Sequence, residues 1–428
     1  MNFRRIYQWL VWGLSSTWYA VVQAQGPFDF ERTPIDYHNQ PASNLVSELQ
    51  EKILAGEVQL EFHRTRGYLD SFLQQLNVSK SSQVLVYSKS SVQLRWISPL
   101  RPRALYFNEE VYVGWVLGGD VLEMIVSDSK LGTVFYTLRQ QETAYPRFQR
   151  DSGQCLQCHA NRRTQQVPGP VVRSLFTESN GQPIYRLGNF NSDHTSPFSQ
   201  RWGGYYVTGN HGPTLHMGNL MADRDTPVKE FDYESGANLT DLSAQFNTGP
   251  YPTGHSDIVA LMVLEHQAQM QNLITKARYE EIQGEHYDAM LHRDQLFGNE
   301  LTQRKVVRVG EALLAYMLFV NEYQLRAPVR GTSGFSEEFS SQGPHDQQGR
   351  SLYQLDLETR LFKYPLSYMI YTDVFRQLPP RVNSYVSQRL YEVLTAESTE
   401  DEFAHLDLDT RKAILQIVEE TCPDLIDH

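Results

Sequence analysis

Two of the three cysteines in this 428-residue chain lie three positions apart, in the stretch CLQCH at residues 155–159. The stretch places two thiols, Cys155 and Cys158, directly before an imidazole, His159. A chain that is stabilised by disulfides carries several cysteine pairs, whereas the remaining cysteine here, Cys422, stands alone near the C-terminus. We interpret Cys422 as a partly buried thiol, so the CLQCH motif needs a chemical explanation of its own.

Three chemical roles are open for this motif. A redox pair of the thioredoxin type begins a helix after a strand, but CLQCH follows the turn-rich stretch AYPRFQRDSGQ. A structural zinc site needs about four protein ligands, and the sequence holds no second cysteine pair. Covalent haem attachment uses two thiols at this spacing and the histidine that follows them. The sequence therefore favours one haem c, with thioethers on Cys155 and Cys158 and with His159 as the proximal iron ligand.

The first 24 residues predict export. Arg4 and Arg5 precede a mostly apolar run at residues 9–22, which has about the length of a secretory signal core. Small residues at positions 22 and 24 favour cleavage after Ala24. A retained anchor is the alternative, although a membrane span needs about 20 apolar residues. We expect a periplasmic protein with no transmembrane segment in the mature chain, which agrees with haem c because this cofactor is attached after export.

The charge of the chain argues against one class of partner. The sequence has 50 acidic and 38 basic residues, which gives a net charge of −12. No basic cluster alternates with aromatic residues, as it would in a surface that binds nucleic acid. We therefore expect no nucleic-acid partner.

The hydrophobic pattern predicts an α+β fold. An α+β domain is expected at residues 25–140, with two helices in residues 41–77 and an antiparallel sheet built from the β-branched and aromatic runs VLVYS, VQLRWI, ALYF, EVYVGWVLGG, VLEMIVSD and TVFYTL. A loop-rich haem c segment follows at residues 141–254. An α-helical C-terminal domain is expected at residues 255–428.

Shorter elements are expected inside the last two segments. The haem c segment is interrupted by proline and glycine, and its predicted strands are residues 183–187, 203–208 and 214–221. The C-terminal segment is expected to form helices at residues 255–281, 306–325, 365–377, 380–395 and 408–420. A loop or lid is predicted at residues 328–350, where Gly, Ser, Pro and Gln are frequent.

The ligand on the far side of the iron is not fixed by the motif. Met217 is ranked first, because it follows His159 by 58 residues, a plausible spacing for a single-haem cytochrome. His216 is ranked second and His266 third, and His211 lies in a glycine-flanked turn nearby. Filling of the apolar core is the open alternative for the methionine. A hydrogen-bonded core position is the alternative for each histidine.

Glu265 and His266 are the candidate catalytic residues. They are adjacent on an apolar helix, and a buried carboxylate beside an imidazole can act as an acid or a base. The alternative, which we prefer, is that Glu265 forms a salt bridge with an arginine such as Arg201 or Arg360.

Four longer runs resemble a known family. They are RDSGQCLQCHA, RWGGYYVTGNHG with HMGN, SDIVALMVLEHQ and LETRLFKYPLSYMIYTDVF, and they span roughly residues 100–420. The chain resembles exported, single-haem proteins with a cytochrome c domain, a family that is mostly uncharacterised. The resemblance implies haem c at Cys155, Cys158 and His159. The chain differs from a small soluble cytochrome c, because the motif is flanked by loop and strand patterns and not by helices.

These observations predict electron transfer by a covalently bound haem, with an unidentified redox partner. A haem-dependent oxidoreductase of the peroxidase or oxidase type is the alternative, with Glu265 or His266 as a distal acid–base group. A haem-based sensor, with the helical domain as its interaction surface, is a third hypothesis.

Overall fold

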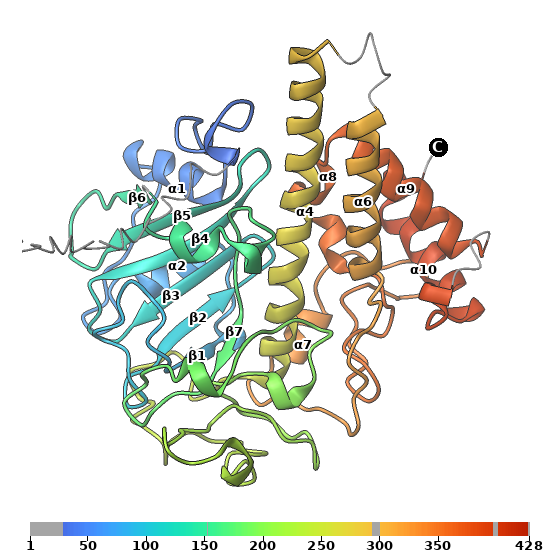
Figure 1. The fold of residues 1–428 in the computed structure, drawn as a ribbon. Coiled ribbons are helices and arrows are strands. Elements are labelled where there is room, and N and C mark those ends of the chain that lie inside the picture. Colours follow the sequence, from blue (N-terminus) through green and yellow to red (C-terminus); the bar gives the residue numbers. More distant parts are fainter. Residues whose placement is uncertain (1–28, 152, 293–299, 397–400, 427–428) are drawn as a thin grey trace, which may run out of the picture.

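A computed structural model describes residues 29–151, 153–292, 300–396 and 401–426. The predicted signal peptide, residues 1–24, lies outside the described residues. The described chain contains an antiparallel sheet of seven strands and a mostly helical C-terminal region (Figure 1). This arrangement confirms the predicted α+β fold. No helix in the described ranges is both long enough and apolar enough to cross a membrane.

The sheet has the strand order β6-β5-β4-β3-β2-β1-β9, and every neighbouring pair is antiparallel. Its strands are β1 (Val84–Val86), β2 (Arg103–Phe107), β3 (Val111–Val116), β4 (Val121–Asp128), β5 (Gly132–Arg139), β6 (Phe148–Arg150) and β9 (Tyr205–Tyr206). Along β4 buried and partly exposed residues alternate, as expected for a strand that buries one face more completely than the other.

One predicted strand of this region is wrong. Residues 92–97 form turns, in which the amides of Leu94 and Trp96 donate to the carbonyls of Ser91 and Gln93. The Gln93 side chain bonds to the backbone of Val121 at the start of β4. The stretch VQLRWI is therefore a loop that the Gln93 side chain anchors to the sheet. In contrast, β6 forms from a stretch whose turn residues suggested a loop.

The two helices predicted in residues 41–77 are confirmed as α1 (Leu45–Leu54) and α2 (Leu69–Gln75). Asn44 caps α1, because its side chain accepts a hydrogen bond from the Ser47 amide. Both helices bury apolar residues in the core that they share with the sheet.

The long helix α4 (Ile258–Met290) lies between the sheet and the C-terminal helices (Figure 1). Its first turns are buried on every side, which is the pattern of an enclosed helix. Asp257 caps its start by accepting from the amides of Val259 and Ala260. Gln267 and Gln271 bond to the backbone after β2, at the carbonyls of Asn108 and Glu109. These bonds fix α4 against the sheet.

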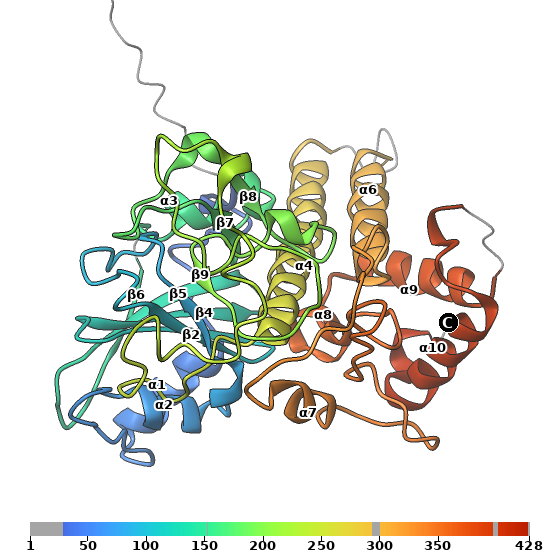
Figure 2. The same ribbon diagram turned by 90° about the horizontal axis from the view of Figure 1, so that it is seen from below.

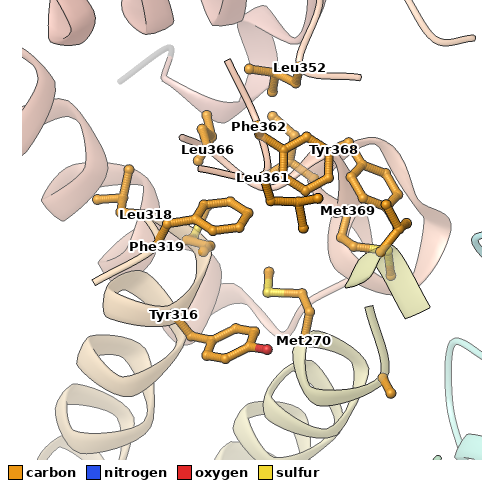
Figure 3. Close-up of a cluster of buried hydrophobic side chains, with 14 of the residues drawn as sticks. Met270, Tyr316, Leu318, Phe319, Leu352, Leu361, Phe362, Leu366, Tyr368 and Met369 are labelled. Atoms are coloured by element: carbon orange, nitrogen blue, oxygen red, sulfur yellow. The ribbon is translucent and has the colours of Figure 1, made fainter. Parts of the chain in front are cut away.

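The C-terminal region packs against the other side of α4 (Figures 1 and 2). Its α-helices are α6 (Glu300–Met317), α7 (Phe335–Ser340), α8 (Asp373–Arg376), α9 (Pro380–Leu394) and α10 (Leu408–Thr421). The helix predicted at 306–325 therefore ends early, and the expected loop at 328–350 holds α7, whose Phe335 and Phe339 are buried. Figure 3 shows side chains of Met270 and Tyr316 pointing from neighbouring helices into an aromatic core with Phe319, Phe362 and Tyr368.

The predicted haem c segment is mostly loops. It contains α3 (Leu156–His159) and the strand pair β7 (Arg173–Leu175) and β8 (Asn189–Asn191). The strand predicted at 203–208 is reduced to β9, which joins the large sheet beside β1. The strands predicted at 183–187 and 214–221 are wrong. Residues 185–187 form a 3-10 turn, and the left-handed backbone of Asn219, with φ of +64°, interrupts the second run.

Candidate functional site

The CLQCH motif forms one helical turn. The amides of Cys158 and His159 both donate to the carbonyl oxygen of Cys155, at 3.1 and 3.0 Å. Residues at positions i, i+3 and i+4 of a helix share one face. The turn therefore presents both thiols and the imidazole on the same side, while Leu156 is buried in the core beside the sheet.

Asp151 fixes the start of this turn. Its Oδ2 accepts from the amides of Gly153 and Cys155, at 2.8 and 2.9 Å. Its own amide donates to the carbonyl of Phe135 on β5. An aspartate that receives amides from the first turn is a usual N-terminal signal, which sequence reasoning missed. The motif is thereby attached to the sheet.

One ring nitrogen of His159 is held by the backbone. Its Nδ1 lies 2.9 Å from the carbonyl oxygen of Gly169, and its ring packs on Phe135 with ring centres 5.1 Å apart. Burial lowers the pKa of His159, so the imidazole is neutral. Nδ1–H then donates to Gly169, and Nε2 keeps its lone pair. Across the described residues Nε2 has no hydrogen-bond partner. A proximal ligand is oriented in this way by a backbone carbonyl.

The two thiols differ in exposure. Cys155 is half-buried, Cys158 is exposed, and both are free. Burial, together with the negative charges of Asp151 and Glu123, raises the pKa of the Cys155 thiol to about 12. A catalytic redox pair needs a thiol with a lowered pKa, so these contacts disfavour the thioredoxin-like alternative.

The zinc interpretation gains no support from the geometry. Over the described ranges no three or more His, Cys, Asp or Glu side chains are grouped so that they could hold a metal ion. Two free thiols and a neutral imidazole on one face, with one ring nitrogen unengaged, are instead the donors that a covalently attached haem requires. The residues present fit that cofactor.

Gly169 is held in a close contact with α4. A Cβ at this position would lie 1.8 Å from Oδ1 of Asn272, and Nδ2 of Asn272 donates to the carbonyl of Pro170 at 3.0 Å. Helix α4 thus positions the carbonyl that orients His159. Sequence reasoning missed both residues, although the glycine between two prolines in VPGPV marks an unusual backbone.

We expect Gly169→Ala to lower the free energy of unfolding by about 1–3 kcal/mol, because the methyl group forces Asn272 or the loop to move. The control is Gly254→Ala, where the added Cβ meets only ordinary van der Waals contacts. Urea unfolding of both variants measures the difference. Equal stability of the two variants would contradict the role assigned to Gly169.

Met217 has the contacts of a core residue. Its side chain is buried beside Phe176 and Ile184, and the hydroxyl of Ser174 donates to its sulfur at 3.6 Å. These contacts suit the core-filling alternative.

His216 and His211 lie side by side, with ring centres 4.7 Å apart, and Trp202 packs on His216. Nε2 of His211 accepts from the amide of Asn238. Neither ring nitrogen of His216 has a hydrogen-bond partner within the described chain. Burial, helped by the neighbouring His211, lowers the pKa of His216 to about 3.

Glu265 forms a buried ion pair with Arg201, with Nη1 3.0 Å from Oε2, which confirms the preferred sequence interpretation. Arg201 also donates to the carbonyls of Ser196 and His194, at 2.7 and 3.0 Å. Burial raises the pKa of Glu265 to about 8, and the positive charge of Arg201 opposes this rise. Arg201 therefore has three hydrogen-bond partners, while the side chains of Trp202 and Ser192 lie beside the Glu265 carboxyl and also oppose the rise of its pKa.

His266 is enclosed by other side chains. Its Nδ1 lies 2.9 Å from Nδ1 of His194, and its Nε2 lies 2.8 Å from the hydroxyl of Ser367. The ring stacks on Phe319, with centres 4.4 Å apart. Sequence reasoning missed His194, because no local pattern links residues 72 positions apart.

The distal candidates make no direct contact with the CLQCH turn in the described residues. Met217, His216 and His266 lie in separate buried surroundings, and no hydrogen bond or ring contact of the described residues joins any of them to the motif. The distal ligand thus stays a prediction. Sequence and structure comparisons add no further guide, since no family model, curated protein or solved structure matches this chain.

Proposed function

We propose that this protein carries one haem c, attached through Cys155 and Cys158 with His159 as proximal ligand, and that it transfers electrons to a redox partner in the periplasm. The observation that carries the proposal is the helical turn of CLQCH. It presents two free thiols and the imidazole of His159 on one face.

The bound haem would supply one-electron chemistry, and the protein would tune it. The Gly169 carbonyl holds Nδ1–H of His159 and so makes the other nitrogen a stronger donor to iron. Asp151 holds the amide of Cys155 and thereby fixes the direction of the first thiol. Hydrogen bonding to the axial ligand and burial of the haem both change the reduction potential of the haem.

The exposure of Cys158 supports a carrier. It leaves the second attachment point at the surface, where a partner can approach. The competing enzyme hypothesis needs an acid–base group that meets substrate, but Glu265 and His266 are fully buried and engaged with Arg201, His194 and Ser367. We therefore favour electron transfer.

Cysteine substitutions test the attachment. We expect Cys155→Ala and Cys158→Ala each to weaken covalent haem binding and the double variant to abolish it, because each thiol forms one thioether. The proteins are expressed with a cytochrome c maturation system, and haem is stained on denaturing gels. Cys422→Ala is the control and should keep its haem, since Cys422 is buried at the C-terminal end of α10. Covalent haem in the double variant would refute the proposal.

A further inference from the structure

A small cavity of about 170 Å³ lies beside the CLQCH turn. Its wall includes Arg162 and Arg163, which follow the motif, and residues 170–172 of the loop that holds His159. Residues 191–193 and α4 close the remaining sides. The volume is below the roughly 300–1,000 Å³ of drug-sized sites, so it suits a group of only a few heavy atoms.

The two arginines of the wall have no carboxylate partner. Arg162 is exposed and Arg163 is half-buried, and in the described structure neither side chain forms an ion pair or a hydrogen bond. Burial and the like charge of Arg173 lower the pKa of Arg163. A partly buried positive charge without a partner is costly, and an anion between these guanidinium groups would relieve that cost.

The other polar groups of the wall interact within the protein. The hydroxyl of Ser192 is buried, 5% exposed, and lies beside the Glu265 carboxyl, whose pKa it lowers. Asp193 supplies one carboxylate, which is already engaged, because its Oδ1 accepts from the amide and hydroxyl of Thr195 at 2.8 and 2.6 Å. Two arginines against one carboxylate leave the wall of the cavity with an excess of positive charge.

We propose that this cavity binds an oxyanion or carboxylate, held by Arg162 and Arg163. Guanidinium groups bind such planar or tetrahedral anions through paired hydrogen bonds. The anion has two sources of the same chemistry. It is either a propionate of the haem attached at Cys158, which rests on the proposed function, or a free anion such as phosphate, which does not.

The test is titration calorimetry with inorganic phosphate on haem-free protein, the Cys155→Ala/Cys158→Ala variant, and on haem-loaded protein. Arg163→Gln should weaken phosphate binding about tenfold or more, the scale of a lost charge-assisted hydrogen bond. The matched control is Arg64→Gln, which removes an exposed arginine without an ion pair far along the chain. It should leave the affinity unchanged.

Comparison of the haem-free and the haem-loaded protein distinguishes a haem propionate from a free anion. Binding to both forms identifies a free anion, whereas binding only to the haem-free form identifies the haem carboxylate. In the second case Arg163→Gln should also lower the midpoint potential of the haem-loaded protein more than Arg64→Gln does, because it removes a nearby positive charge. The proposal is overturned if Arg163→Gln and Arg64→Gln match in both phosphate affinity and potential. If the chain with both cysteines intact acquires no haem in a host that matures c-type cytochromes but still binds phosphate, the proposed function is refuted and the anion site stands.

Discussion

Above about pH 8, where the Glu265 carboxyl is ionised, replacing Glu265 with leucine should lower the free energy of unfolding by about 3–5 kcal/mol, the usual cost of removing one partner from a buried ion pair. The reason is that Arg201 would keep its charge at 2% exposure with only carbonyl oxygens as partners. Urea unfolding followed by circular dichroism measures the change.

Two further variants make this test specific. Glu358→Leu removes the partner of Arg330 from an ion pair whose side chains are both exposed, and it should cost only about 0–1 kcal/mol. Glu265→Gln keeps an oxygen that accepts from Arg201 and should cost less than Glu265→Leu. Equal effects of Glu265→Leu and Glu358→Leu would show that the buried pair contributes no more than a surface one.

Acidification from about pH 6.5 to about pH 5 should destabilise the protein by about 2–6 kcal/mol. Burial lowers the pKa of His194, and lowers the pKa of His216 and His266 to about 3. In the unfolded chain these histidines take up protons near pH 6.5, but the folded protein does not. The unfolded state then binds more protons, so stability falls by about 1.4 kcal/mol per pH unit for each histidine.

Carboxyl groups whose pKa is raised by burial reduce this effect. Burial raises the pKa of Glu265 to about 8 and that of Glu322 to about 7. Below these values the folded protein binds protons that the unfolded chain releases, so these groups add stability as the pH falls. His159, His211 and His405, whose pKa values are also lowered by burial, act with the other histidines. Glu110 and Glu281, whose pKa values are raised by burial, act with Glu265 and Glu322. Unfolding free energies measured at both pH values decide the sign, and equal or greater stability at the lower pH would contradict the prediction.

The fold was predictable from sequence where the pattern is local. The helical stripe that begins at Leu45 and the alternation of β4 each repeat within a few residues, and both elements form as predicted. VQLRWI shows the same alternation but becomes a loop, because Gln93 and Trp96 use their side chains to bond to the sheet and the adjoining turn. The alternation of apolar and polar residues alone cannot distinguish a strand from a loop that its side chains hold on the sheet.

The candidate site, too, was predictable only where its residues follow a local sequence pattern. The two thiols and His159 are neighbours in sequence, so one helical turn is enough to bring them to one face. The ion pair of Glu265 was also predictable, because an apolar helix buries its carboxylate and a buried charge needs a partner. The contact of Asn272 with Gly169, and that of His194 with His266, depend on packing between distant segments. No sequence pattern indicated them.

The most direct measurement is mass spectrometry of the tryptic peptide of residues 151–162, released by cleavage after Arg150 and Arg162. The protein is purified from a host that matures c-type cytochromes. We predict that this peptide carries the mass of one haem, with fragment ions that place it on Cys155 and Cys158. Recovery of the same peptide with two unmodified thiols, from cells that attach haem to a control cytochrome, would contradict the central claim.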